Sequence, residues 1–247
     1  MIRTAVAVIL AASLILAASL TVQDGTPNPQ AEFYFVRLEY PGFHDNTYLK
    51  NWYTDYPQAD EHFVVLVNRL TVIKAAKALV HIDDNIFQYP FIYIVESAQM
   101  NLTDAHIEKL REYTARGGFI LLDDIHGDED MIPLMATFER VFPGEPLVEL
   151  SIDHEIFHTF FDIDTIIQVV HDGIAMCKTC QQWENGPSGE HPKVLAHYGT
   201  RGIDAVVMVN NDLGDGCQWL DDANYPREMS IFAAKMLLNT VIYALSH

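Results

Sequence analysis

Two adjacent aspartates and a histidine follow an apolar run in the middle of the chain. The run is Phe119–Leu122, and Asp123, Asp124 and His126 come directly after it. Carboxylates and an imidazole at the end of a strand can bind a divalent metal or serve as acid and base. Asp124 and His126 are therefore candidate catalytic residues and candidate metal ligands, and Asp123 is a candidate ligand-binding residue. The alternative is that Asp124 caps the next helix and His126 lies in an ordinary loop.

A second polar group has the spacing of a zinc motif. The segment His154–His158 matches H-E-x-x-H, with Glu155 directly after the first histidine. In a zinc peptidase the two histidines bind the metal and the glutamate is the general base. A helix at this place would be very short, and a five-residue motif also occurs by chance. His154 is kept as a candidate metal ligand and ligand-binding residue.

A third group, Asn210–Trp219, is rich in Asn, Asp and Gly and follows a predicted strand. Oxygen atoms at this density can hold a cation. The spacing is not that of an EF-hand, and a loop of turns is the simpler interpretation. Asn211 and Asp212 are the candidate ligand-binding residues of this group.

An aromatic group lies closer to the amino terminus. Aromatic rings with a few polar groups suit the binding of a sugar or another small molecule, and they equally suit a packed lid over a sheet edge. Arg37 and Trp52 are taken as candidate ligand-binding residues. The whole group consists of Arg37, Tyr40, His44, Trp52, Tyr53, Asp55 and Tyr56.

The elements that must position these groups alternate between strand and helix. Apolar and alternating runs predict strands at Phe33–Tyr40, Ala78–Ile82, Phe91–Val95, Phe119–Leu122, Lys193–Tyr198 and Asp204–Val209. Helical spacing predicts a helix capped by Asp60, and further helices at Thr103–Arg116, Glu129–Val141 and Pro226–Leu245. This order predicts an α/β fold, a doubly wound and mostly parallel sheet with helices on both faces. Ligands of such sheets bind beyond the carboxyl ends of the strands.

Size and charge limit the classes of partner. The chain has 247 residues, 49% of them hydrophobic, which predicts a folded chain with a substantial core. Its 15 Lys and Arg residues face 34 Asp and Glu residues, for a formal net charge of −19. Such a surface repels phosphate backbones, so nucleic acid is not an expected partner.

The amino-terminal segment Met1–Val22 has the pattern of a signal peptide. Arg3 is its single charge, an apolar run follows, and Ala17 and Ser19 suit a cleavage site. We therefore expect an exported protein, periplasmic or extracellular. The alternative is an uncleaved anchor, which would be the one contact with a membrane. Residues 23–30 are an expected linker, and residues 31–247 an expected single α/β domain.

The three cysteines fit an oxidising compartment in several ways. Cys177 and Cys180 form a C-x-x-C motif, and Cys217 stands apart. A disulfide within the motif, a disulfide to Cys217, a metal site and a redox site all remain open.

Several stretches together resemble the bacterial domain-of-unknown-function family 4159. They are FYFVRLEY, the W-x-T-D-Y-P of Trp52–Pro57, Tyr89-Pro90-Phe91, RGGFILLDDIHG, Phe142-Pro143, DHEIFHTFF and NNDLGDG. The resemblance implies a fold similar to glutamine amidotransferases and flavodoxin, and it carries no established activity. It also implies that Glu155 and His158 are incidental in their stretch. The G-x-C-x-G of the amidotransferase nucleophile is absent from the sequence, so a glutaminase is not expected.

The leading functional hypothesis is an exported α/β protein that binds a small molecule or carbohydrate at the carboxyl edge of its sheet. A divalent metal is a candidate cofactor. One alternative is a hydrolase in which Asp124 and His126 activate water, with or without a metal. Another is a non-catalytic module of a cell-envelope assembly, with a protein partner at the loop around Trp52.

Overall fold

The structure is a computed structural model that describes residues 30–43 and 51–247. Its strands are β1 (Phe33–Glu39), β2 (Ala75–His81), β3 (Phe91–Val95), β4 (Phe119–Ile125), β5 (Val148–Glu149), β6 (Lys193–Gly199) and β7 (Gly202–Val209). They form one sheet in the order β2-β1-β3-β4-β7-β6-β5. The pairs from β2 to β7 are parallel, and β6 runs antiparallel to β7 and β5.

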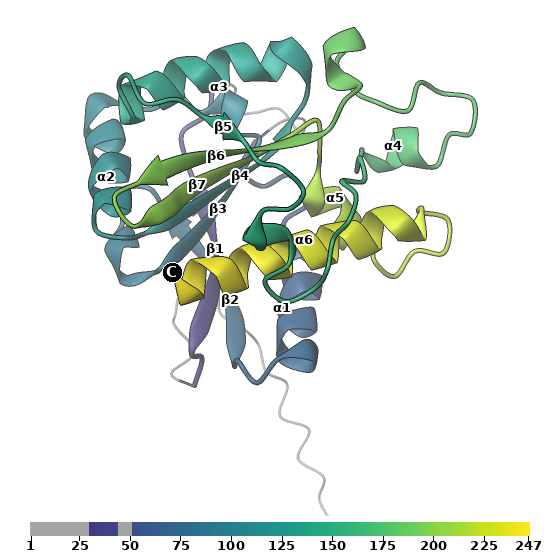
Figure 1. The fold of residues 1–247 in the computed structure, drawn as a ribbon, viewed down its shortest axis with the longest axis horizontal. Coiled ribbons are helices and arrows are strands. Elements are labelled where there is room, and N and C mark those ends of the chain that lie inside the picture. The colour runs from purple at the N-terminus through teal and green to yellow at the C-terminus, as the bar shows by residue number, and fades with distance from the viewer. Residues whose placement is uncertain (1–29, 44–50) are drawn as a thin grey trace, which may run out of the picture.

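Helices cover both faces of this sheet (Figure 1). They are α1 (Gln58–Leu70), α2 (Asp104–Ala115), α3 (Gly127–Val141), α4 (Asp172–Ala175), α5 (Leu213–Gln218) and α6 (Arg227–Ser246). Helices α2 and α3 pack on one face, while α1, α5 and α6 pack on the other. The predicted doubly wound α/β fold with a mostly parallel sheet is therefore confirmed, and it is of the flavodoxin-like kind.

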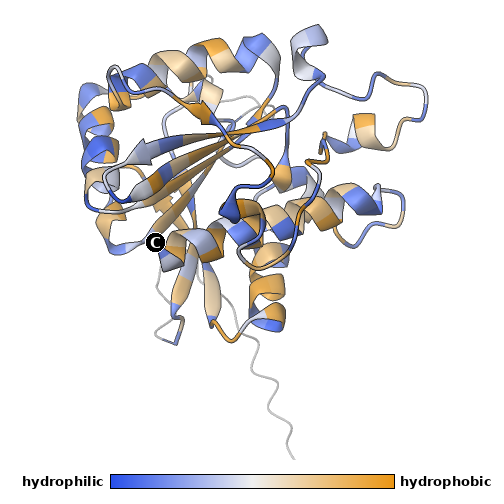
Figure 2. Ribbon diagram, in the orientation of Figure 1, coloured by the Kyte–Doolittle hydropathy of each residue, from blue (hydrophilic) through white to orange (hydrophobic). Residues whose placement is uncertain are grey.

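The central strands are buried on both faces, as expected for parallel strands between two helical layers. Along β3, Phe91, Tyr93 and Val95 face the layer of α1 and α6, while Ile92 and Ile94 face the layer of α2 and α3. Figure 2 shows these strands as mostly hydrophobic and the helices as striped. Two separate apolar cores thus lie above and below one sheet.

The predicted strands and helices are all present, although several of their ends shift and short elements such as α4 were not predicted. Thr103 caps α2 as predicted, and its side chain accepts a hydrogen bond from the His106 amide. Asp60 does not cap α1, which begins at Gln58, because the Asp60 carboxylate is buried against Arg37. The Gly-rich stretch after β7 contains the short helix α5 rather than turns alone. The two-residue strand β5 has no signal in the sequence, since both of its residues are exposed.

Helix α6 is long and apolar enough to cross a membrane, and within the described residues it is the single helix of this kind. About half of its apolar window is buried inside the molecule (56%). Residues such as Phe232, Met236 and Val241 pack in the core on one face of the sheet. Helix α6 is therefore a core helix.

Three predictions fall outside the described residues. They are the signal peptide at Met1–Val22, all but the last residue of the linker at 23–30, and the place of His44 in the aromatic group.

Candidate functional site

The end of β4 carries the two predicted aspartates. Asp123 is fully buried, and its Oδ2 accepts hydrogen bonds from the Tyr93 hydroxyl (2.5 Å) and the Gly214 amide (3.2 Å). Asp124 has a left-handed backbone (φ 61°), where the pairing of β4 with β7 shifts register. The N-cap position of α3 is held by His126, whose side chain makes no capping hydrogen bond, so the alternative that Asp124 caps this helix is wrong.

The end of β7 brings a second pair of polar residues to the same edge. Asp212 caps α5, because its Oδ1 accepts a hydrogen bond from the Asp215 amide (2.7 Å). Asp215 follows in the first turn of α5 and accepts a hydrogen bond from the Trp219 indole (2.9 Å). Both aspartates are buried. The polar stretch after β7 thus contributes two carboxylates from the start of one short helix.

The loop between β1 and α1 contributes a further carboxylate, that of Asp55. Arg37 holds this loop in place, since its guanidinium donates hydrogen bonds to the carbonyl oxygens of Trp52 (3.3 Å) and Thr54 (3.0 Å). The same guanidinium is paired with Asp60 (2.5 Å). Arg37 is fully buried, so it holds the loop around Trp52, which we call the aromatic loop, from the interior of the molecule.

These carboxylates act on one another and form what we call the acidic cluster. The cluster consists of Asp55, Asp123, Asp124, Glu184, Asp212 and Asp215. Burial raises the pKa of Asp55, Asp124 and Asp212 well above the usual range of a carboxyl group, and neighbouring carboxylates raise it further.

In two members of the acidic cluster, hydrogen bonds limit the rise of the pKa. Burial raises the pKa of Asp123, while hydrogen bonds from Tyr93 and backbone amides lower it. Burial also raises the pKa of Asp215, to about 6, against hydrogen bonds that include that of Trp219. Hydrogen bonds offset only part of the cost of gathering these charges away from water. The acidic cluster is therefore costly to the fold, which is typical of a functional site.

His126 lies against the acidic cluster. Its Nε2 is 3.2 Å from Asp124 Oδ1 and 3.7 Å from Glu184 Oε1. Its backbone is fixed on both sides, because its amide donates to Asp130 Oδ2 and its carbonyl accepts from Asn185 Nδ2. Neither ring nitrogen of His126 makes a hydrogen bond of good geometry, although the ring is almost completely buried.

Residues 171–191, which we call the cover segment, close over this edge of the sheet. Glu184 comes from this segment, and its Oε1 accepts a hydrogen bond from the His171 amide (3.0 Å). Asn210, directly after β7, binds the segment through the carbonyl oxygens of Ser188 (2.9 Å) and His191 (2.8 Å). The cover segment is thus tied to the strand ends by side chains of both partners.

Left-handed backbone gathers at this edge as well. All the described non-glycine residues with positive φ lie here, on the loop before α1, at the ends of β3, β4 and β7, and in the cover segment. They are Asp55, Glu96, Asp124, Asn185 and Asn210. Such conformations are sparsely populated by L-residues and concentrate at ligand sites.

The structure brings only some of the predicted residues together. Asp123, Asp124, His126 and Asp212 lie in or against the acidic cluster. Asn211 is near them in sequence, but both ends of its amide bind the backbone of the preceding segment, at Val169 N (3.1 Å) and Ile167 O (3.1 Å). Trp52 is half-buried on the loop that carries Asp55.

His154 is not brought to the acidic cluster. Its Nε2 lies 3.3 Å from the Tyr198 hydroxyl, and its ring lies beside Tyr243. It begins the short 3-10 helix η3 (Glu155–Phe157). The zinc motif therefore lacks the α-helix that would place both histidines on one face. Both ring nitrogens of His158 contact other groups, the Asp162 carboxylate and the Ile152 carbonyl oxygen.

A metal ion fits these residues poorly. Among the residues that the structure describes, no three His, Cys, Asp or Glu side chains are placed to hold one. The carboxylates of the acidic cluster come from separate elements, namely the loop before α1, the end of β4, the cover segment and the start of α5. A metal-bound site at Asp124, His126 and His154 is thus not supported by the arrangement of these side chains.

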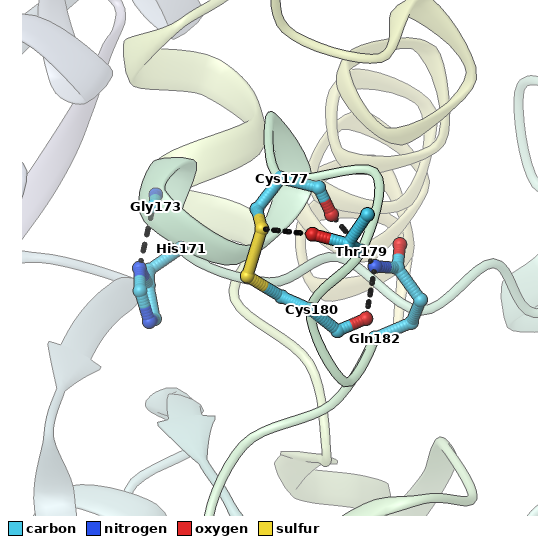
Figure 3. The surroundings of a disulfide bond; sticks show 6 residues. All are labelled: His171, Gly173, Cys177, Thr179, Cys180 and Gln182. Atoms are coloured by element: carbon cyan, nitrogen blue, oxygen red, sulfur yellow. Dashed lines mark hydrogen bonds between the residues drawn. A yellow bond between two sulfur atoms is a disulfide. The ribbon is translucent and has the colours of Figure 1, made fainter.

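The three cysteines adopt one of the predicted pairings. Cys177 and Cys180 form a disulfide within the cover segment (Figure 3). Cys217 is buried and free. The amide of Gln182 donates to the carbonyl oxygens of both bridged cysteines, at 3.1 Å and 2.9 Å. The disulfide thus orders the turn just before Glu184.

The acidic cluster includes three residues that were not among the predicted site residues, Asp55, Glu184 and Asp215. Asp55 and Asp215 stood inside polar groups already singled out, and their carboxylates could have been proposed with them. Glu184 carries no such signal, because it lies in a long irregular segment whose path depends on contacts with Asn210 and His126.

Comparison with known proteins identifies a family. The family described as "Domain of unknown function (DUF4159)" matches residues 35–245, a range that contains the whole acidic cluster. No curated protein matches the chain. The function therefore rests on the geometry of the site.

Proposed function

The chain belongs to the DUF4159 family, and we propose that it binds a small molecule or carbohydrate at the carboxyl edge of its sheet, with Asp124 and His126 at the centre of the site. One observation carries this proposal. Asp123 Oδ1, Asp55 Oδ2 and both ring nitrogens of His126 are buried without a hydrogen-bond partner at a single edge of the sheet. Buried polar atoms of a folded protein are nearly always satisfied, and a bound ligand is one way to satisfy them.

The chemistry of these atoms defines the ligand in outline. Carboxylate oxygens only accept hydrogen bonds when they are ionised, and a neutral imidazole accepts at one nitrogen. The ligand must then be rich in hydrogen-bond donors, as hydroxyl and amine groups are. An anionic ligand would meet the like charge of the acidic cluster.

The aromatic loop adds a surface of aromatic rings that suits such a ligand. Trp52 packs edge to face with Tyr53 and Tyr56, and all three rings are partly exposed. Arg37 holds the loop so that Asp55 lies in the acidic cluster. Aromatic rings beside a few polar groups are typical of sites for sugars and small amphiphilic molecules.

A ligand panel with matched variants tests this proposal. Calorimetric titration of the full-length chain with neutral sugars, amino sugars and short diamines should find at least one binding compound. Asp124→Asn and His126→Gln should each weaken its binding at least tenfold, and Asp153→Asn, an exposed aspartate outside the acidic cluster, should leave it unchanged. Equal binding by all four proteins would contradict the proposed site.

A second candidate is a hydrolase, favoured by one specific contact. The left-handed backbone of Asp124 aims its carboxylate at His126, with 3.2 Å between Oδ1 and Nε2. A carboxylate that orients an imidazole is a common arrangement for activating water. Turnover of an ester, amide or glycoside by the wild-type chain, absent in Asp124→Asn, would support the hydrolase. Binding without turnover would leave the ligand-binding function alone.

Three broader expectations remain proposals. We propose that the chain is exported, which the Cys177–Cys180 disulfide supports, since disulfides persist in oxidising compartments. A likeness to glutamine-amidotransferase folds stays a prediction, and burial holds the pKa of the Cys217 thiol well above its usual value, which does not suit a nucleophile. A protein partner in the cell envelope, contacting the loop around Trp52, is the third.

A further inference from the structure

We propose that the ligand of the acidic cluster is an organic cation, a molecule that carries at least one protonated amine. This inference rests on the proposed function, because it names the ligand class of the same site. It follows from the charge of the site, from its unpartnered atoms and from the close approach of Asp55 and Asp212 to Gly214.

The charges around the site do not balance. The carboxyl groups that face one another are those of Asp55, Asp123, Asp124, Glu184, Asp212 and Asp215. The cationic groups near them are few. Arg37 is already paired with Asp60, and His126 supplies at most one charge. Burial and mutual repulsion raise the pKa of these carboxyl groups and so favour their protonated forms, and a cation from outside would allow more of them to ionise.

The unpartnered atoms point to a cation independently of the charge count. Asp55 Oδ2 is buried at this edge of the sheet without a hydrogen-bond partner. Asp123 is fully buried, and its Oδ1 has no hydrogen-bond partner, whereas its Oδ2 accepts from Tyr93 and Gly214. A protonated primary amine brings three N–H donors to such acceptors.

The spacing of the acceptors favours an organic cation over a metal ion. No three acidic or histidine side chains of the described chain are gathered closely enough to hold a metal. The acceptors come instead from the loop before α1, from the end of β4 and from the start of α5. An ammonium group on a carbon frame can reach across such a spread, whereas a metal ion needs ligands at about 2 to 2.6 Å around one point.

Gly214 keeps the space for Asp55 open. A Cβ atom at position 214 would lie 2.2 Å from Asp55 Oδ2 and 3.2 Å from Asp212 Oδ1. Its amide meanwhile donates to Asp123 Oδ2. Glycine at this position therefore lets three carboxylates approach one turn of backbone. A substitution here disturbs the acceptors without changing any charge.

The experiment compares amines with matched alcohols that lack their positive charge. The full-length chain is titrated calorimetrically with glucosamine against glucose, and with 1,4-diaminobutane against 1,4-butanediol. At least one amine should bind at least tenfold more tightly than its matched alcohol, and added sodium chloride should weaken that binding. Magnesium, calcium and manganese chlorides are titrated in parallel.

Two variants and a control locate the binding. Gly214→Ala and Asp123→Asn should each weaken amine binding at least tenfold, while Asp153→Asn should not change it. Circular dichroism checks that each variant folds, and Asp215→Asn replaces either one that does not.

The outcomes separate the two proposals. Equal binding of alcohol and amine would overturn the cationic ligand and leave the proposed function standing. Binding of a divalent metal alone, lost in Asp123→Asn, would also overturn it, in favour of a metal site. Two further results would overturn the cationic ligand: binding of none of the amines, or amine binding that Gly214→Ala and Asp123→Asn leave unchanged. The proposed function would fail only if the neutral sugars also did not bind.

Discussion

At the scale of the residue, Asp124 is the member of the site whose placement is least favourable for the stability of the fold. Its backbone is left-handed, its side chain is buried, and its nearest charged neighbours are carboxylates and His126. The free energy of the fold would be lower without this negative charge. Functional sites commonly show this conflict between stability and activity.

Replacing Asp124 by asparagine should therefore stabilise the protein. Asparagine tolerates the left-handed backbone as well as aspartate does, and it removes a carboxyl group whose pKa burial has raised. We expect the free energy of unfolding at pH 7 to rise by about 1 kcal/mol, as measured by urea denaturation. Asp153→Asn serves as the control and should change it little. A clear loss of stability in Asp124→Asn would mean that its carboxylate is well satisfied.

The pKa of Asp215 predicts how stability depends on pH. Burial raises this pKa from 3.8 to about 6, so the folded state binds a proton more tightly than the unfolded state does. The resulting stabilisation is present below about pH 4 and is lost as the pH rises through about 6. Compared with Asp215→Asn, the wild type should lose about 1 to 3 kcal/mol between pH 4 and pH 7. Parallel stability curves for the two proteins would contradict this origin of the shift.

At the scale of the element, the start of α3 is packed against the cover segment. Gly127 begins α3 with a left-handed backbone (φ 62°), and its amide donates to Asn210 Oδ1. A Cβ atom there would lie 2.8 Å from the carbonyl oxygen of Asn185 and 2.9 Å from Ser188 Oγ. The start of this helix therefore has room for the cover segment only because residue 127 is glycine.

Gly127→Ala should loosen the cover segment. We expect a loss of about 3 kcal/mol, because the left-handed backbone costs about 1 to 2 kcal/mol for alanine and the clash adds to it. Gly144→Ala is the matched control, since Gly144 is also left-handed but a Cβ there meets nothing within 4 Å. Hydrogen exchange of residues 184–191 should rise in the first variant and not in the second. Equal effects of both variants would show that the contact is unimportant.

At the scale of the whole molecule, net charge opposes compactness. The formal net charge of −19 makes the folded chain repel itself, and the acidic cluster concentrates part of that charge in its interior. Screening by salt weakens repulsion between exposed charges. Repulsion of this kind is spread over the surface and does not depend on any single pair.

Salt should consequently stabilise the protein. Raising sodium chloride from about 10 mM to about 150 mM shortens the Debye length from about 30 Å to about 8 Å. We expect the melting temperature to rise by about 2 to 4 °C, which corresponds to about 1 kcal/mol for a chain of this size. Scanning calorimetry at the two salt concentrations measures the shift. A fall in melting temperature would mean that attractive ion pairs dominate the surface.

The sequence by itself determined the class of the fold and the edge at which the site lies. Apolar runs such as Phe91–Val95 and Phe119–Leu122, each followed by a helical pattern, predict buried parallel strands, because only a sheet covered on both faces buries them. Asp123 and Asp124 come directly after an apolar run and Asp212 comes shortly after another, so their common edge could be predicted from chain direction alone.

Only the tertiary structure decided which side chains meet. His154 follows no strand of the parallel core, and its segment packs against Tyr198 and Tyr243 instead. Asp55 and Glu184 join the acidic cluster from loops whose paths depend on Arg37, Asn185 and Asn210. Local patterns report the period and direction of an element, whereas the path of a loop depends on contacts between residues far apart in the chain.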